Sequence, residues 1–227
     1  MESGVAVSRQ TDAPDETERV RRHYEDLAPK YDKLIRFAEK ILFRDCRRWA
    51  CSQAAGDVLE VAIGTGRNLP FYPAGVRLTG IELSPAMLEL ARQRANELGR
   101  EVDLRVGDAQ ALDFPDHRFD TVVCTLSLCC IPNDRKAVAE MKRVLRFGGQ
   151  LVLLDHVASD VLLVRAVQRL LEPLSVRFGA DSLMRRPLEH VRAEGFEIKW
   201  QERSKWGIVE RVIARKPVPS PSGRGLG

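Results

Sequence analysis

The strongest constraint on the fold is a hydrophobic pattern that alternates between short apolar runs and helical periodicity. The apolar runs occupy residues 57–62, 76–82, 102–106, 119–125 and 150–155, and the first of them ends in a glycine-containing loop. Strands that are almost wholly apolar and that alternate with helices indicate a parallel sheet with helices on both faces. The pattern therefore predicts an α/β fold.

The helices between these runs have recognisable ends. Ser84 and Pro85 suit the cap and the first position of a helix that Gly99 ends. Its buried face is predicted to contain Met87, Ala91, Ala95 and Leu98. A second helix is predicted over residues 133–147, where Gly148 and Gly149 follow.

The last part of the chain predicts two further strands, at residues 196–202 and 210–215. Their connection is too short for anything but antiparallel pairing. We therefore expect a Rossmann-like, seven-stranded, mostly parallel sheet with one antiparallel strand near the edge.

The chain divides into four segments by composition. Residues 19–56 are predicted to be helical, and Pro29 is expected to divide them into two helices. Residues 57–216 are expected to form the main domain. Residues 1–18 and 217–227 lack a core-forming pattern and are predicted to be a disordered arm and tail.

Composition argues against several classes of protein. A net charge of +4 without a dense basic stripe gives no reason to expect a nucleic-acid partner. No apolar run approaches the roughly 20 residues of a membrane span, and the N-terminus lacks the apolar core of a signal peptide. The odd number of cysteines, five, argues against a disulfide framework. We expect a cytoplasmic protein, and we make no prediction of its oligomeric state.

The cysteines do not predict a metal site. Cys129 and Cys130 are adjacent, and Cys46 and Cys51 also lack the paired spacing of zinc sites. They are better interpreted as small buried apolar residues, and no metal is expected.

Four polar or glycine-containing features follow successive strands. Gly64 and Gly66 form a turn that lets a ligand approach the backbone, and Glu60 precedes it. Glu82 ends the next strand, where a carboxylate can accept hydrogen bonds from ribose hydroxyls. Asp108 follows the third strand, and Thr125 ends the fourth. Each has an ordinary structural explanation, as a turn, cap or core residue, but their order and spacing together favour a nucleoside site.

With these features, the chain resembles class I S-adenosylmethionine-dependent methyltransferases over about residues 20–216. The matching stretches are Val58 to Gly66, Gly80 to Leu88, Gly107 to Ala109, Phe119 to Val123 and Val144 to Gly149. The resemblance implies S-adenosylmethionine as the methyl donor and S-adenosylhomocysteine as the product. The cofactor-binding residues that it implies are Tyr31, Glu60, Ala62, Gly64, Gly66, Asn68, Glu82, Leu83, Met87, Asp108, Ala109, Thr125 and Leu126.

Two residues depart from the family pattern. Ala62 stands where the family usually has glycine, which costs about 1 kcal/mol if the backbone φ is positive there. Phe147 replaces a usual proline in what we expect to be the turn that ends a helix. We expect both to be tolerated.

Shorter stretches are similar to three subgroups of that family. Residues 23–32 look like the helical lid of ubiquinone and menaquinone C-methyltransferases, so residues 19–56 are expected to form an N-terminal lid. Residues 123–130 and 155–157 look closer to enzymes that methylate alkyl thiols. Phospholipid N-methyltransferases share much of the same sequence pattern. The acceptor is therefore expected to be a small, apolar thiol, quinol carbon, amine or hydroxyl.

His156 is the best candidate for a general base, because it follows the fifth strand at the edge where α/β proteins bind ligands. A histidine that only packs or caps explains it as well. The residues expected to contact the acceptor are His23, Tyr24, Cys129 and Leu170.

Residues 161–178 combine leucines and valines with three arginines, Arg165, Arg169 and Arg177. They predict a helix that covers the sheet, an apolar wall for an apolar acceptor, or a basic helix that lies on a membrane surface.

Three alternative functions remain open. The chain could be a phospholipid N-methyltransferase at a membrane surface. It could bind S-adenosylmethionine without catalysis, which the Ala62 departure favours. An NAD-dependent oxidoreductase fits less well, because Leu69 occupies the place of the third glycine in that fingerprint.

Overall fold

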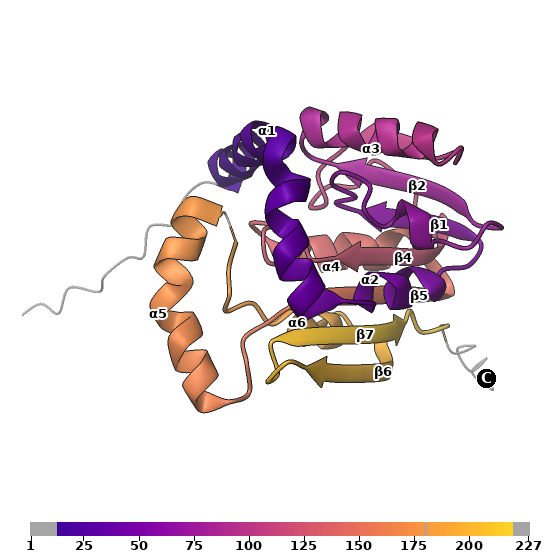
Figure 1. Cartoon of the computed structure of the whole chain (residues 1–227). Helices are drawn as coiled ribbons and strands as arrows, with labels where there is room; N and C mark the ends of the chain where they lie inside the picture. Colours follow the sequence, from indigo (N-terminus) through magenta and orange to yellow (C-terminus); the bar gives the residue numbers. More distant parts are fainter. Residues whose placement is uncertain (1–12, 180, 220–227) are drawn as a thin grey trace, which may run out of the picture.

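The computed structural model describes residues 13–179 and 181–219. Seven strands form one sheet in the order β3-β2-β1-β4-β5-β7-β6 (Figure 1). The strands are β1 (Asp57–Val61), β2 (Arg77–Glu82), β3 (Asp103–Val106), β4 (Phe119–Thr125), β5 (Leu145–His156), β6 (Glu197–Ser204) and β7 (Val209–Arg215). Strand β7 is antiparallel to both of its neighbours, and the other pairs are parallel. The predicted fold class is confirmed.

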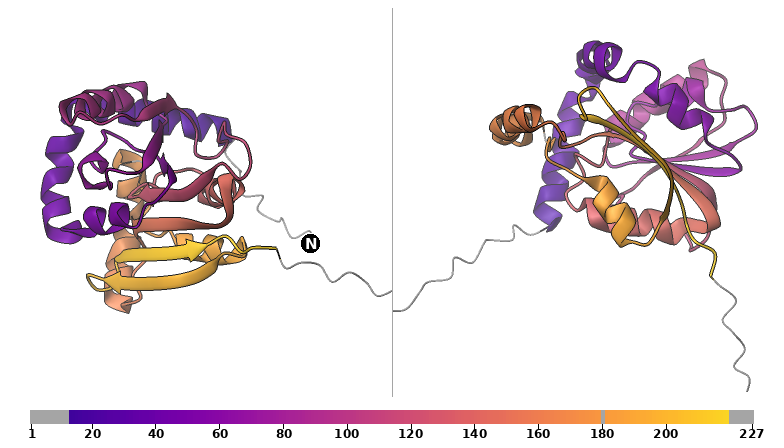
Figure 2. Two further views of the ribbon diagram at one scale, coloured as in Figure 1. Left: turned by 90° about the vertical axis from the view of Figure 1, so that its right-hand side faces the viewer. Right: turned by 90° about the horizontal axis from the view of Figure 1, so that it is seen from below.

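Helices cover both faces of the sheet (Figure 2). On one face, α2 (Cys46–Ser52) and α3 (Pro85–Glu97) share a core with β1, in which Leu88 packs near Val58. On the other face, α4 (Asp134–Val144) and α6 (Pro187–Ala193) share a core with β4 and β5. The short helix α6 was not predicted from the sequence.

The predicted start of α3 is confirmed, because Ser84 Oγ accepts a hydrogen bond from the Met87 amide at 3.2 Å. Its predicted buried face is wrong at Leu98, which is exposed. The predicted helix over 133–147 is also too long. It ends at Val144, because Leu145 is buried in the core and pairs with Phe119 as the first residue of β5. Phe147 therefore lies in a strand and not in a helix-ending turn.

The N-terminal segment differs from the prediction of two helices. One helix, α1 (Ala13–Ala38), continues through Pro29 and changes direction between its two halves (Figure 1). A π-helical turn, η1 (Glu39–Phe43), leads on toward α2. Residues 13–18 are helical, so the predicted arm is wrong there, while residues 1–12 lie outside the described residues. Of the predicted tail, 217–219 form neither helix nor strand and 220–227 are outside the described residues.

Helix α5 (Leu162–Gly179) confirms the prediction of a helix at 161–178, but it does not cover the sheet. Figures 1 and 2 show it standing beside the second half of α1, beyond the carboxyl ends of the parallel strands. Among the described residues, no helix is long and apolar enough to cross a bilayer.

Candidate functional site

A cavity of about 670 Å³, here called the loop cavity, opens at the carboxyl ends of β1, β2 and β4. Helix α1 closes its outer side with Val20, Arg21, Tyr24 and Tyr31. Most of the predicted cofactor residues lie on its wall, namely Tyr31, Ala62, Gly64, Glu82, Leu83, Met87, Asp108, Ala109 and Leu126. Their contact with a cofactor stays a prediction, but the fold brings them together around one space.

The carboxylate of Glu82 is buried in the wall and held by the backbone. Its Oε2 accepts from the Gly64 amide and its Oε1 from the Ser84 amide, both at 3.0 Å. Burial raises the pKa of Glu82, although these amide hydrogen bonds oppose the shift. Each oxygen keeps a lone pair for a further donor. A ribose diol could donate to these lone pairs, and ribose binding by Glu82 stays a prediction.

Asp108 is oriented in a similar way on the other side of the cavity. Its Oδ1 accepts from the Gln110 amide at 2.8 Å, and the Gln110 side chain contacts both carboxylate oxygens. Gln110 also lines the loop cavity and was missed by the sequence analysis. It carried no signal, because a glutamine two residues beyond an ordinary turn aspartate belongs to no motif.

Two residues with side chains and one glycine on the wall of the loop cavity have positive φ. Gly64 has φ of +59°, and a Cβ there would meet only Met87 Cε at 3.9 Å, so its surface faces open space. Ala62 and Leu126 each have φ of +54°, which is unfavourable for residues with a side chain. Because φ is positive at Ala62, the expected cost of about 1 kcal/mol relative to glycine applies there.

Four predicted cofactor residues do not line the cavity wall, namely Glu60, Gly66, Asn68 and Thr125. Asn68 Nδ2 donates to Glu60 Oε1 at 2.7 Å and to Thr125 Oγ1 at 2.8 Å. Arg47 of α2 donates to Asn68 Oδ1 and to Thr125 Oγ1. Burial raises the pKa of Glu60 to about 7, against the effect of these hydrogen bonds. These residues support the loop.

Helix α1 is fastened to the loop by polar contacts that the sequence did not reveal. Thr65 Oγ1 donates to Asp32 Oδ1 at 2.6 Å, and Arg94 of α3 pairs with the same carboxylate. Ser84 Oγ donates to Glu25 at 2.7 Å. The second half of α1 is thus positioned by a hydroxyl of the loop and a charge of α3, which lie far away in the sequence.

A second cavity of about 1020 Å³, here called the His156 cavity, lies on the other side of α1 residues Tyr24 and Tyr31. Both cavities have Tyr24, Tyr31, Leu126 and Cys130 in their walls. The predicted acceptor residues His23, Tyr24 and Cys129 line the second cavity. Leu170 does not, because it points away on α5 and is 80% exposed, so that prediction is wrong.

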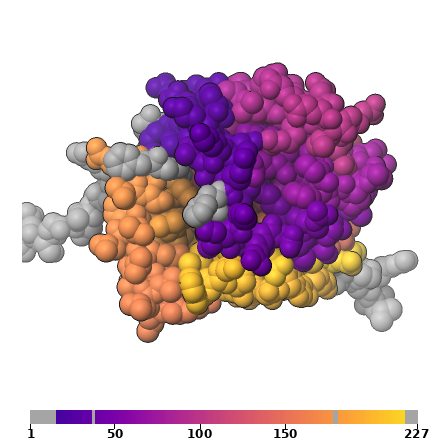
Figure 3. Space-filling model, viewed as in Figure 1, coloured from indigo at the N-terminus to yellow at the C-terminus, as the bar shows by residue number. Residues whose placement is uncertain are grey.

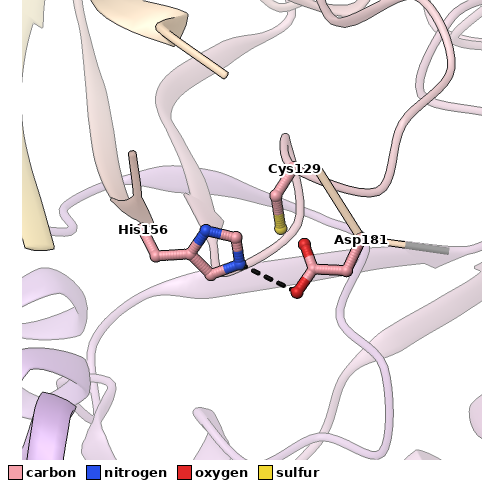
Figure 4. Close-up of side chains that lie close together, drawn as sticks. All are labelled: Cys129, His156 and Asp181. Carbon is pink, nitrogen blue, oxygen red and sulfur yellow. Dashed lines mark hydrogen bonds and ion pairs between the residues drawn. The ribbon is translucent and has the colours of Figure 1, made fainter. Parts of the chain in front are cut away.

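His156, Cys129 and Asp181 form a compact cluster on the wall of the His156 cavity (Figure 4). One potential ligand atom from each lies within 4.8 Å of the others, although the sequence predicted no metal site. His156 Nε2 and Asp181 Oδ2 are already paired at 3.0 Å, so these two atoms satisfy each other. Asp181 follows α5 in an irregular segment and was missed, because no motif surrounds it.

The charge state of His156 follows from this pair. Burial alone would lower its pKa, but the Asp181 carboxylate outweighs burial and raises the pKa to about 9. The pKa of Asp181 is correspondingly lowered by His156, despite burial. Near neutral pH the pair is therefore an imidazolium facing a carboxylate. His156 Nδ1 is buried and has no partner among the described residues.

Comparisons with known proteins agree with this architecture. A family model described as a methyltransferase domain matches residues 59–153. The chain is 45% identical over 129 residues to a phosphatidylethanolamine N-methyltransferase of Cereibacter sphaeroides, covering 56% of this chain and 64% of that protein. It is 36% identical over 166 residues to a demethylmenaquinone methyltransferase of Deinococcus radiodurans, covering 70% and 69%. It is 34% identical over 137 residues to a human thiol S-methyltransferase, covering 58% and 55%. The match thus spans slightly less than two thirds of the first of these relatives.

Solved structures share the fold at lower identity. A methyltransferase from Thermotoga maritima has a TM-score of 0.65 at 19% identity, and the match covers 86% of this chain and 99% of that one. The [4+2]-cyclase SpnF has a TM-score of 0.61 at 23% identity, covering 77% and 80%. The presence of a cyclase among these structures shows that the fold alone does not specify the reaction.

The strain at Ala62 predicts a stabilising substitution. Ala62→Gly should raise the free energy of unfolding by about 1 kcal/mol, because glycine adopts positive φ without steric cost. Urea denaturation measures the change. Ala109→Gly is the matched control on the same cavity wall, at a residue without positive φ, and it should destabilise by about 0.5–1 kcal/mol. An equal decrease in the free energy of unfolding of both variants would show that Ala62 is not strained.

The attachment of α1 predicts a change in ligand affinity. Asp32→Asn removes the charge that pairs with Arg94, so α1 should close less often and S-adenosylhomocysteine should bind about 5–10-fold more weakly. Isothermal titration calorimetry measures this. Glu16→Gln is the control, because Glu16 lies on the same helix and pairs with Arg19, and neither residue lines a cavity. Unchanged affinity in Asp32→Asn would show that the contact does not govern closure.

Proposed function

The chain belongs to the class I S-adenosylmethionine-dependent methyltransferases, and we propose that it transfers the methyl group to a small apolar acceptor bound in the His156 cavity. The observation that carries this proposal is the pair of adjoining cavities with a common wall at Tyr24, Tyr31, Leu126 and Cys130. One cavity has the carboxylates expected for a nucleoside donor. The other is lined mainly by apolar and aromatic residues from α1.

Bound S-adenosylmethionine supplies an electrophilic methyl group on a sulfonium, which is already a good leaving group. The residues of this chain therefore have to orient the reactants, and positioning of this kind contributes about 7–11 kcal/mol in intramolecular models. Glu82 and Asp108 would hold the nucleoside from two sides, and Tyr31 and Leu126 would separate donor from acceptor. Helix α1 covers this junction and would exclude water from it.

The His156–Asp181 pair favours an acceptor that reacts as an anion. An imidazolium with a pKa of about 9 does not accept a proton near neutral pH, so the predicted role of His156 as a general base is not what this ion pair supports. Its Nδ1 is fully buried, so the imidazolium would act on a bound thiolate or quinolate through its positive charge. The acceptor proton then leaves to solvent before methyl transfer, and the nucleophile gains the methyl group while the sulfonium sulfur keeps the electron pair. Where the nucleophile is a quinol carbon, its ring C–H proton leaves to solvent after the transfer, which restores the aromatic ring.

A second candidate is N-methylation of phosphatidylethanolamine. The relative from Cereibacter sphaeroides favours it by its 45% identity. A nearby imidazolium lowers the pKa of an amine and so favours the neutral nucleophile, but it opposes the positive charge that develops on nitrogen as the methyl group arrives. We therefore place a thiol or quinol first and the phospholipid amine second.

A panel of acceptors distinguishes these functions. The purified full chain is incubated with methyl-labelled S-adenosylmethionine and an alkyl thiol, a demethylated quinol or phosphatidylethanolamine vesicles. We expect labelled thioether or methylated quinol, and inhibition by S-adenosylhomocysteine. Product from the vesicles alone would support the second candidate. Binding of S-adenosylhomocysteine without any product would favour a non-catalytic binding protein, and tight binding of NAD with no response to the sulfonium would contradict the proposal altogether.

The ion pair predicts a pH-dependent defect if the acceptor is a thiol. His156→Gln should lower kcat/KM about 100-fold at pH 7, because the thiolate loses its cationic neighbour. The defect should shrink as the pH rises beyond the pKa of the free thiol, which is about 8.5 for cysteine. His190→Gln is the control, because His190 pairs with Asp134 at 3.4 Å and lines neither cavity. A defect of the same size at every pH would show that His156 only supports the structure.

A further inference from the structure

Helix α5 has its polar and apolar sides reversed relative to an ordinary surface helix. Its inward side is polar and is fixed by hydrogen bonds. Gln168, only 7% exposed, accepts from the Ser159 amide at 2.8 Å and donates to the Val157 carbonyl at 3.0 Å. Glu172 accepts from Ser182 Oγ at 2.6 Å and from the Leu183 amide at 2.7 Å. Polar contacts therefore hold α5 in place, while a surface helix normally buries an apolar stripe.

The apolar side of α5 faces outward. Leu163, Val167 and Leu174 follow one another at spacings that place them on one helix face, and all are exposed. Leu162 and Leu163 are 79% and 76% exposed. Figure 3 shows the helix as a lobe at the side of the molecule. A contiguous apolar surface of this kind, on a helix held elsewhere by polar contacts, marks an interaction site.

The tip of the β6–β7 hairpin extends this surface. Ser159 Oγ, just before α5, donates to the Trp206 carbonyl, which fixes the hairpin beside the start of the helix. Trp206 is 73% exposed, and its neighbour Lys205 is exposed too. Tryptophan beside an exposed lysine is typical of the region where membranes meet water.

The charge of this surface is positive. Helix α5 carries Arg165, Arg169 and Arg177 but only one acidic residue, Glu172, which faces inward. Ser175 of the same helix lines the His156 cavity, so the helix reaches from the outer surface to the cavity wall.

We propose that α5, together with Trp206, lies in the interface of an anionic phospholipid bilayer. The outward leucines and valines bury among the acyl chains, while the arginines and Lys205 contact lipid phosphates, as in other amphipathic helices that lie in a membrane surface. This places the wall of the His156 cavity at the surface from which an apolar acceptor would come. The proposal concerns binding and does not depend on which acceptor is methylated. A second copy of the chain is the competing occupant, but the positive charge favours an anionic lipid surface.

Vesicle binding tests the proposal with the full chain. Flotation with phosphatidylglycerol-containing vesicles should recover the protein, and pure phosphatidylcholine vesicles should bind it less. Tryptophan fluorescence should shift to shorter wavelength on binding, and Trp206→Phe should remove that shift.

Two variants and a matched control separate lipid contact from misfolding. Leu162→Ser with Leu163→Ser should weaken vesicle binding at least about 10-fold. Arg169→Gln should weaken it about 5-fold and only on anionic vesicles. Leu98→Ser with Val218→Ser, which changes exposed apolar residues outside α5 and the hairpin, should bind like the original chain. All variants should retain affinity for S-adenosylhomocysteine, which shows that they are folded.

Three outcomes would overturn the proposal. The first is that the original chain does not bind anionic vesicles. The second is that the double leucine variant binds them as tightly as the original chain does. The third is a concentration-dependent dimer in sedimentation that the leucine variant abolishes while vesicles bind neither protein, since α5 would then be an interface between copies. Activity on a soluble acceptor does not enter any of these outcomes, so failure of the proposed methyl transfer would be recognised separately.

Discussion

The carboxylate of Glu60 is buried at the end of β1, in the centre of the sheet, and the arrangement above the sheet depends on how it is satisfied. Asn68 bridges it to Thr125 on β4, and Arg47 completes the bridge from α2. Arg47 also pairs with Glu39, which lies in the turn that follows α1. One polar network therefore joins two strands, the glycine-containing loop and the N-terminal helices. Burial of a carboxylate is costly, and Glu60 Oε2 has no hydrogen-bond partner among the described residues. The network therefore offsets only part of the cost, and only when all of these elements are in place.

The same strand ends hold the two strained residues that line the loop cavity. Ala62 and Leu126 follow β1 and β4 directly, and both have positive φ. Strain of this kind persists where surrounding contacts determine the backbone, and it is common at binding sites. Here the Leu126 amide donates to the Leu154 carbonyl at 2.7 Å, and Thr125, the residue before Leu126, belongs to the Glu60 network. A preformed floor avoids ordering the loop when the donor binds, which lowers the entropic cost of binding.

The sequence predicted those parts of the molecule that depend on local chemistry. The start of α3 at Ser84 and Pro85 and the turn at Gly64 could be predicted, because each of these residue types suits a particular backbone conformation. The strand pattern likewise predicted the sheet and the antiparallel β7. Asp32 and Asp181 could not be predicted, because their partners lie far away in the sequence. The end of α4 was misplaced because the pairing of Leu145 with Phe119 overrides the helical pattern.

The exposed apolar side of α5 and the His156–Asp181 pair are parts of one connected structure. Glu172 and Gln168, on the inner side of α5, hold the segment around Leu183 through its side chains and backbone. That segment carries Asp181, and the Ser182 amide donates to the Cys129 carbonyl on the cavity wall. The orientation of α5 therefore follows from its inner contacts, because turning its leucines inward would withdraw Glu172 from the segment that positions Asp181. These contacts leave an apolar surface exposed to water, which is unfavourable. Contact with lipid would remove the leucines from water without disturbing the ion pair.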